Sequence, residues 1–208
     1  MIQFTLFGIP VRIEPWFWLT CAFLGGILYA QTADDFLRVA MFTLAAFVSV
    51  LIHEMGHALT IRKYRLPTQV VLSTFGGYAT YPSGILTRKQ SFLVTAAGPL
   101  IQLVFGLLVL LAQAYLPAMG GRIDLFAYYL ILISIVWAVF NCLPIYPMDG
   151  GQMLAAILGP RKGKALHLTG LIVSVGVGLL ALSYGWYFMA IFMGMFAYQN
   201  FQMSQQYR

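Results

Sequence analysis

The sequence has few charged residues. Only 9% of its 208 residues are Asp, Glu, Lys or Arg, while 61% are hydrophobic. A soluble domain carries about 25% charged residues, so this chain has too few charges to coat a surface that faces water. The composition therefore indicates a polytopic protein of the lipid bilayer, and the length fits a single domain over residues 1–208.

Cysteine and solvated basic segments are also scarce. Cys21 and Cys142 both lie in apolar runs without metal-type spacing, which favours two buried small hydrophobic side chains. The formal net charge of +6 comes from basic residues clustered in short loops. Nucleic-acid binding needs a solvated basic face, and the sequence shows none, so we expect no nucleic-acid partner.

Long apolar runs dominate the chain and predict about six transmembrane helices. The runs cover residues 16–31, 38–61, 91–116, 125–143, 166–183 and 185–200. The first run lacks a convincing signal-peptide cleavage pattern and begins with aromatic residues suited to a membrane interface, so we expect it to be retained. Six spans place both termini on one side, together with all basic residues except Arg38 and Arg122. The positive-inside rule then predicts a multi-pass plasma-membrane protein with both termini cytoplasmic.

One segment between the second and third runs does not fit a helix. Residues 66–82 read LPTQVVLSTFGGYATYP, with β-branched and aromatic residues around Gly76 and Gly77 and a proline near either end. This pattern is typical of a β-hairpin, at the membrane surface or in a protein-lined cavity. The predicted fold class is therefore an all-α membrane protein with one small membrane-associated hairpin.

The sequence HEMGH at residues 53–57 carries the chemical signal. His53 and His57 are four residues apart and share one face of a helix, so both imidazoles can reach one metal ion. Glu54 lies on the adjacent face, where it can act as a general base. An ionised side chain at the bilayer centre costs about 2.5–3.5 kcal/mol, which disfavours a chance occurrence in an apolar run.

A zinc site needs a third protein ligand and an open fourth position. The chain has six acidic residues, and apart from Glu54 only Asp149 stands in apolar company, in NCLPIYPMDGGQ. We therefore predict Asp149 as the third ligand of one zinc ion per chain. His167, the remaining histidine, follows a basic loop and is interpreted as an interfacial polar residue.

The segment around Asp149 is also unusual. Pro144 and Pro147 precede the acid and Gly150 and Gly151 follow it, which predicts unwound backbone that lines a cavity. Asn141 supplies a carboxamide nearby. It either donates to a developing oxyanion in catalysis or serves as a polar residue at a helix end, and the sequence leaves both interpretations open.

In these motifs the chain resembles the site-2 protease family of intramembrane zinc metalloproteases. The motifs are HEMGH at 53–57, the Gly76–Gly77 hairpin, AAGPLIQ at 96–102 and NCLPIYPMDGG at 141–151, in the family's order. The resemblance implies ligands His53, His57 and Asp149, the base Glu54 and a catalytic role for Asn141. Gln102 and Met148 depart mildly from the family pattern. The chain looks like a minimal form without PDZ or CBS domains.

The function expected from these features is cleavage of transmembrane segments of other membrane proteins. The resemblance implies substrates such as membrane-anchored transcription regulators, anti-sigma factors or signal-peptide remnants. We expect the hairpin with Gly76 and Gly77 to bind the substrate strand, the alternative being a hairpin that merely plugs the protein. His57 stands five residues before Arg62, about 7.5 Å of helix, which predicts a site near the cytoplasmic side. The alternatives are a catalytically silent zinc-binding membrane protein and a transporter.

Overall fold

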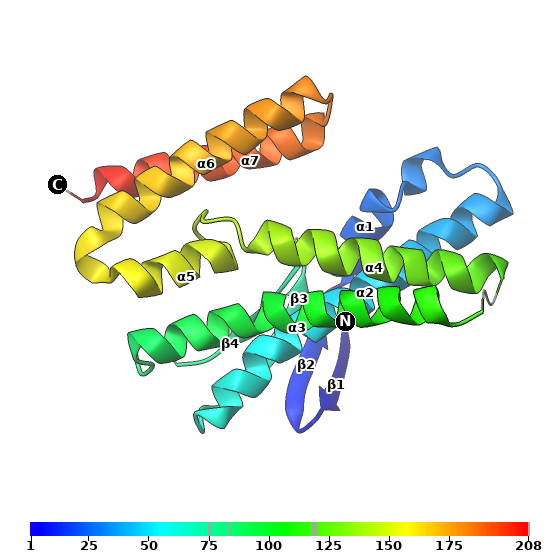
Figure 1. Ribbon diagram of the computed structural model, residues 1–208, viewed down its shortest axis with the longest axis horizontal. Helices are drawn as coiled ribbons and strands as arrows, with labels where there is room; N and C mark the ends of the chain where they lie inside the picture. The colour runs from blue at the N-terminus through cyan, green and yellow to red at the C-terminus, as the bar shows by residue number, and fades with distance from the viewer. Residues whose placement is uncertain (75, 83, 118–119, 208) are drawn as a thin grey trace. The chain divides into compact units, whose positions relative to one another are not determined.

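The computed structural model describes residues 1–74, 76–82, 84–117 and 120–207. The chain divides into two compact units, residues 1–85 with 97–139 and residues 86–96 with 140–208. Figure 1 shows the helices and the small sheet along the chain. The strands are β1 (Ile2–Leu6), β2 (Ile9–Ile13), β3 (Gln69–Ser73) and β4 (Gly76–Thr80). The α-helices are α1 (Pro15–Leu24), α2 (Ala33–Lys63), α3 (Arg88–Tyr115), α4 (Gly121–Asn141), α5 (Asp149–Leu158), α6 (Gly163–Ser183) and α7 (Tyr187–Gln205). Two short 3₁₀ helices cover Ile27–Tyr29 and Pro160–Lys162.

The first unit contains a four-stranded sheet rather than a lone hairpin. β3 and β4 pair antiparallel within the segment predicted as a hairpin, and Phe75 of that segment lies outside the described residues. β2 adds to the other side of β3 in parallel, and β1 pairs with β2. The all-α prediction is therefore wrong for the N-terminal residues. The β1–β2 pair reads as a hairpin because Phe7 and Gly8 at its turn both have positive φ.

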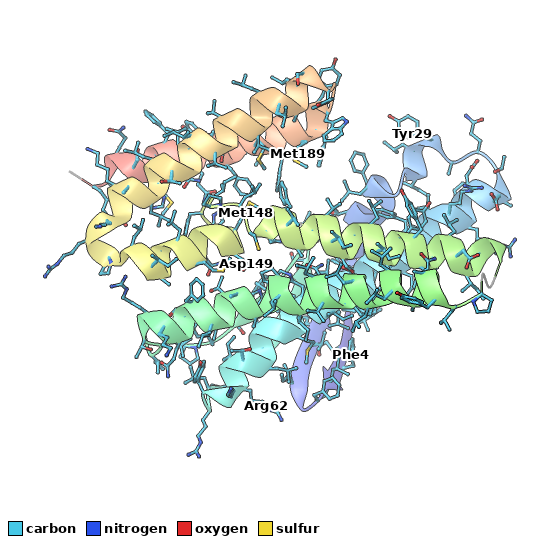
Figure 2. All side chains as sticks on the ribbon, in the orientation of Figure 1. Phe4, Tyr29, Arg62, Met148, Asp149 and Met189 are labelled. Carbon is cyan, nitrogen blue, oxygen red and sulfur yellow. The ribbon has the colours of Figure 1, made fainter. Side chains whose placement is uncertain are left out.

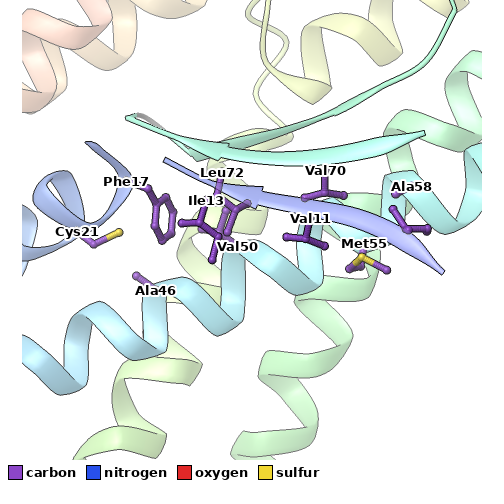
Figure 3. Close-up of a cluster of buried hydrophobic side chains, with 11 residues drawn as sticks. Val11, Ile13, Phe17, Cys21, Ala46, Val50, Met55, Ala58, Val70 and Leu72 are labelled. Atoms are coloured by element: carbon purple, nitrogen blue, oxygen red, sulfur yellow. The ribbon is translucent and has the colours of Figure 1, made fainter. Parts of the chain in front are cut away.

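The sheet packs on α2 and α1 through an apolar core. Figure 3 shows that β2 and β3 supply Val11, Ile13, Val70 and Leu72, while the helices supply the facing side chains. From α2 these are Ala46, Val50, Met55 and Ala58, and from α1 they are Phe17 and Cys21. Alternate residues of a strand point to the same face, which explains the spacing of 11 and 13 and of 70 and 72.

Among the described residues, four helical segments are long and apolar enough to cross a membrane. They are Ala33–Lys63, Arg88–Tyr115, Gly121–Asn141 and Pro160–Ser183. They correspond to the second to fifth predicted runs. The first predicted run, 16–31, is not one helix: α1 ends after 10 residues at Gly25, and Gly26 adopts a left-handed φ of 88° before the 3₁₀ turn.

The second unit is built on the α6–α7 pair. The two helices lie side by side, α7 returning along α6 after a short turn at Gly185 (Figure 1). Residues 142–148 connect α4 to α5 as irregular backbone. Ile145 and Met148 of this connection form a buried cluster with Met193 of α7. The segment predicted as unwound, 144–151, is thus irregular only as far as Met148, because α5 begins at Asp149.

A candidate metal centre

Two stripes of α2 carry the candidate metal ligands and the candidate base. Ser49, His53 and His57 are four residues apart and all buried. Val50 and Ala58, also buried, face the sheet, and Glu54 stands midway between them on that second stripe. His53, Glu54 and His57 expose 3%, 4% and 8% of their surfaces, so none of them is a solvated side chain. Burial of this kind needs polar partners or a metal ion.

The two imidazoles point at one another. Nε2 of His53 lies 3.1 Å from Nε2 of His57, as the four-residue spacing predicts. Two nitrogens bound to one tetrahedral zinc ion at about 2.0–2.1 Å lie about 3.3 Å apart. The observed separation therefore fits a pair of ligands that converge on one ion.

A chain of buried side chains fixes the first imidazole. Nδ1 of His53 lies 2.8 Å from Oε1 of Gln102 on α3. The amide nitrogen of Gln102 donates to Ser49 Oγ at 2.9 Å, and Ser49 Oγ lies 2.9 Å from Ser134 Oγ on α4. The same nitrogen also donates to the Ser49 carbonyl, which can only accept, so Oε1 must face His53. His53 then carries its hydrogen on Nδ1 and leaves the Nε2 lone pair for a metal.

Small residues allow α3 to pack closely against the face of α2 that carries His53 and His57. A Cβ on Gly98 would lie 2.3 Å from the His57 ring, and a Cβ on Gly56 would lie 2.6 Å from the Ala97 carbonyl oxygen. Gly98 and Gln102 are themselves one helical turn apart, so a turn of α3 faces the turn of α2 that carries the histidines. The motif AAGPLIQ thus supplies both the space for His57 and the partner of His53.

Strand β4 lies directly against Glu54, the candidate base. A Cβ on Gly77 would come within 2.5 Å of Glu54 Cγ and 2.8 Å of its Cδ. Gly76, with φ 129°, has a conformation that glycine favours, and a Cβ there would meet Trp137 of α4 at an ordinary 3.5 Å. Of the two glycines predicted to bind substrate, Gly77 is the one in contact with the candidate base.

Asp149 and Asn141 belong to the second unit. Asn141 is the last residue of α4 and is half-buried, and Asp149 is buried at the first position of α5 (Figure 2). A Cβ on Gly150 would lie 2.2 Å from the Cys142 and Leu143 carbonyl oxygens, and one on Gly151 would lie 2.4 Å from Tyr146 N. Because positions 150 and 151 are glycines, the connection 142–148 can fold back onto the first turn of α5. This close approach is the structural reason for the two glycines after Asp149.

Three residues that lie at the histidines received no predicted role from the sequence: Gln102, Gly98 and Gly56. The signal that could have found Gly98 and Gln102 is a glycine and an amide four residues apart in an apolar helix. His167, predicted as an interfacial polar residue, is 2% exposed inside the second unit, where Nδ1 lies 3.1 Å from Asn200 Oδ1.

Comparison with known proteins identifies the family. Residues 41–121 and 117–184 match Peptidase family M50, which covers more than half of the chain. The chain belongs to this family. Its relatives include a zinc metalloprotease of Methanocaldococcus jannaschii, 29% identical over 88% of this chain and 52% of that protein. A candidate zinc metalloprotease of Synechocystis sp. is 31% identical over 90% of this chain and 50% of that protein. The chain spans about half the length of these relatives.

A solved structure has the same fold. The site-2 protease from Methanocaldococcus jannaschii superposes with a TM-score of 0.66 and 25% identity, covering 98% of this chain and 94% of that one. The M50 chain described here also has the donor set that zinc prefers: His53, His57 and Asp149 are buried and each offers one ligand atom. Two converging imidazole nitrogens and a buried carboxylate fit a zinc cofactor.

Proposed function

We propose that this protein is an intramembrane zinc endopeptidase that hydrolyses peptide bonds within or near transmembrane segments of other membrane proteins. The position of Glu54 carries the proposal: a buried carboxylate beside His53, on a helix long enough to span, in contact with a strand at the edge of a sheet. A site that only holds metal needs no such carboxylate, whereas hydrolysis needs a base next to the reacting bond.

Each residue of the candidate centre has a separate role in the proposed hydrolysis. His53, His57 and Asp149 would hold the ion, which when bound polarises the scissile carbonyl and lowers the pKa of water to about 7. Glu54 takes a proton from the water whose oxygen attacks the carbonyl carbon. The carboxylic acid formed then gives that proton to the leaving nitrogen as the C–N bond breaks. Asn141 donates a hydrogen bond to the developing oxyanion.

Strand β4 receives the substrate in this proposal. β4 is an edge strand, paired with β3 along one side only in the described sheet. A transmembrane helix must unwind before it can be cut, and its freed backbone groups need partners in lipid. The open edge of β4 supplies them by β-augmentation, and the contact of Gly77 with Glu54 brings such a substrate strand close to the base.

The edge can be tested with proline, which removes one backbone donor. In an antiparallel pair only alternate residues bond to the partner strand, so either Tyr78 or Ala79 directs its N–H to the open edge. We expect one of the two variants, Tyr78→Pro or Ala79→Pro, to keep zinc and β3 pairing but to lose cleavage. Full activity in both would mean that the hairpin only plugs the protein.

The membrane arrangement follows from the helices. Besides the four candidate spans, α7 has 19 residues, about 28 Å, and pairs along α6, which favours a place in the same bilayer. α1 is apolar but, at 10 residues, about 15 Å long, so it completes six membrane segments as a partial one. The basic residues favour cytoplasmic termini, and the contact of Arg62, near the end of α2, with the Phe7 carbonyl supports an N-terminus on that same side. Substrates are then cut in the inner half of their spans.

Glu54→Gln tests the function. The full chain would be reconstituted in proteoliposomes with a set of synthetic single-span peptides, and products would be identified by mass spectrometry. Wild type should bind one zinc and release fragments cut within the inner half of a span. Glu54→Gln should keep the zinc and slow cleavage by several orders of magnitude, because the proton acceptor is gone while both imidazoles remain.

Other outcomes would favour other functions. A wild-type protein that binds zinc but cuts none of the peptides would favour a silent zinc-binding membrane protein. One that binds no zinc would favour a transporter. Cuts confined to outer halves or soluble loops would contradict the cytoplasmic placement of the site.

A further inference from the structure

Asn200 of α7 forms three hydrogen bonds in the interior of the second unit. Its side chain is fully buried. Nδ2 donates to the Tyr146 carbonyl at 2.7 Å and to the Phe196 carbonyl at 2.9 Å. Oδ1 lies 3.1 Å from Nδ1 of His167 on α6. Because the two carbonyls can only accept, the orientation of the amide is fixed, and His167 must carry its hydrogen on Nδ1.

The carboxamide fills a closely built slot. A Cβ on Gly170 would lie 2.5 Å from Asn200 Oδ1, so only glycine leaves room there. The Tyr146 ring meets the His167 ring edge-on, with centroids 5.5 Å apart. His167 is 2% exposed. Buried polar groups with all their bonds made select one arrangement over others, since a shift leaves several groups unpaired at once.

The Tyr146 carbonyl belongs to the connection that ends at Asp149. Four consecutive carbonyls of this connection accept hydrogen bonds. Those of Ile145, Pro147 and Met148 are satisfied locally, by Met148 N, by the Gln152 side chain and by Gln152 N. The carbonyl of Tyr146 is instead satisfied from another helix, by Asn200.

Local hydrogen bonds are not the only support of this connection. Pro144 and Pro147 have no N–H, so two of its residues cannot donate a backbone hydrogen bond. Apolar packing supplies part of the remaining support: Met148, beside Asp149 in Figure 2, joins the cluster of Ile145 and Met193. The hydrogen bond from Asn200 adds a preferred distance and angle to this packing.

We propose that Asn200, oriented by His167, is a positioning residue for Asp149. The inference rests on the proposed function, in which Asp149 is a zinc ligand. Asn200 holds the backbone three residues before the ligand, and His167 holds Asn200. Without this clamp the carboxylate samples several positions, and zinc is held less tightly. Mutation of a residue that orients a metal ligand typically lowers metal affinity by about 10–100-fold.

Zinc affinity of the full chain in detergent, measured by competition with a chelator, tests the clamp. Asn200→Ala should weaken zinc binding by about 10–100-fold. Gly170→Ala, which pushes on the carboxamide without changing it, should weaken binding in the same direction and covers the case in which Asn200→Ala fails to fold. Ser204→Ala is the matched control, because Ser204 is also buried on α7 but bonds only within its own helix. It should bind zinc as wild type does.

A double-mutant cycle separates positioning from general damage. If Asn200 acts through Asp149, then Asn200→Ala should cause no further loss of affinity in an Asp149→Ala background. An equal loss in both backgrounds, or wild-type affinity in Asn200→Ala and Gly170→Ala, would overturn the clamp while leaving the protease intact. Zinc binding that is unchanged in Asp149→Ala would overturn the clamp and the proposed ligand together. Absence of zinc from wild type would overturn the proposed function itself.

Discussion

At the residue scale, the candidate centre depends on atoms that fix one another. Glu54 and His53 are neighbours in sequence, but they have different surroundings. His53 faces an amide and two hydroxyls through Gln102, and Glu54 faces the backbone of a glycine strand. This difference suits His53 to hold a metal ion and Glu54 to exchange protons, as the proposed function requires.

Gln102→Met should weaken zinc binding while preserving the fold. Methionine has a similar length but cannot accept the His53 Nδ1–H, so the imidazole loses its fixed tautomer and orientation. We expect about tenfold or greater loss of zinc affinity, measured by chelator competition. Gln113→Met on the same helix is the control, because Gln113 is exposed and bonds to the Asp124 carbonyl. Equal zinc affinity in the two variants would show that Gln102 does not support the ligand.

Gly98→Ala should remove zinc. The added methyl would lie 2.3 Å from the His57 ring, and ring and helix backbone have little room to yield. Zinc content by mass spectrometry of the purified protein should fall well below one ion per chain. Gly194→Ala, a helical position with nothing within 4 Å of the added carbon, should retain full zinc content. A zinc-loaded Gly98→Ala protein would mean that His57 is not held against α3.

At the element scale, α2 is the organising helix of the first unit. Its 31 residues begin with a capping box, in which Thr32 and Asp35 satisfy each other's backbone N–H groups, and end at Lys63. One face contacts α3 through the histidine stripe, and another carries the sheet. Gly77 of strand β4 therefore contacts Glu54 of α2, so the edge strand lies beside the candidate metal centre.

Gly77→Ala should separate metal binding from catalysis. The added carbon would lie 2.5 Å from Glu54 Cγ, so β4 or the carboxylate must shift, while the histidines keep their partners on α3. We expect unchanged zinc content and at least about tenfold slower cleavage in proteoliposomes, since a displaced base loses most of a contribution of about 10²–10⁴. Gly176→Ala, also with nothing within 4 Å, is the control. Normal cleavage by Gly77→Ala would place the working base elsewhere.

At the scale of the whole molecule, the long helices present apolar side chains outward. Leu108, Ile172, Leu179 and Ile191 are each more than half exposed. In water such a surface would aggregate, whereas in a bilayer it is the expected lipid-facing surface.

Topology reporters test the predicted orientation. Fusions after Asp35 and after Arg122 should lie outside the cell, and a fusion after Lys164 should lie in the cytoplasm, because the basic residues then fall inside. Enzymatic reporters with opposite compartment requirements, fused at each point, give the readout. An external fusion at Lys164 would contradict the arrangement with both termini cytoplasmic.

The sequence by itself determined the class of molecule and the donor set of its candidate centre. Charge scarcity and apolar runs identified membrane helices, and the spacing of His53 and His57 placed two imidazoles on one face, since helix geometry is local and periodic. The apolar surroundings of Asp149 singled it out among the acids, and the β-branched residues around Gly76 and Gly77 indicated the hairpin. Each of these signals lies within one short segment, so it can be read without knowing which segments pack together.

The tertiary structure decided the contacts between distant segments. The sheet forms only because residues 9–13 pair with residues 69–73, and no local pattern announces a partner some 60 residues away. Gln102 reaches His53, Gly77 reaches Glu54 and Asn200 reaches Tyr146 in the same way. Buried polar groups must find partners wherever the fold provides them, so their identity depends on which elements pack together. For the same reason the burial of His167 and its contact with Asn200 could not be read from its basic neighbours in the sequence.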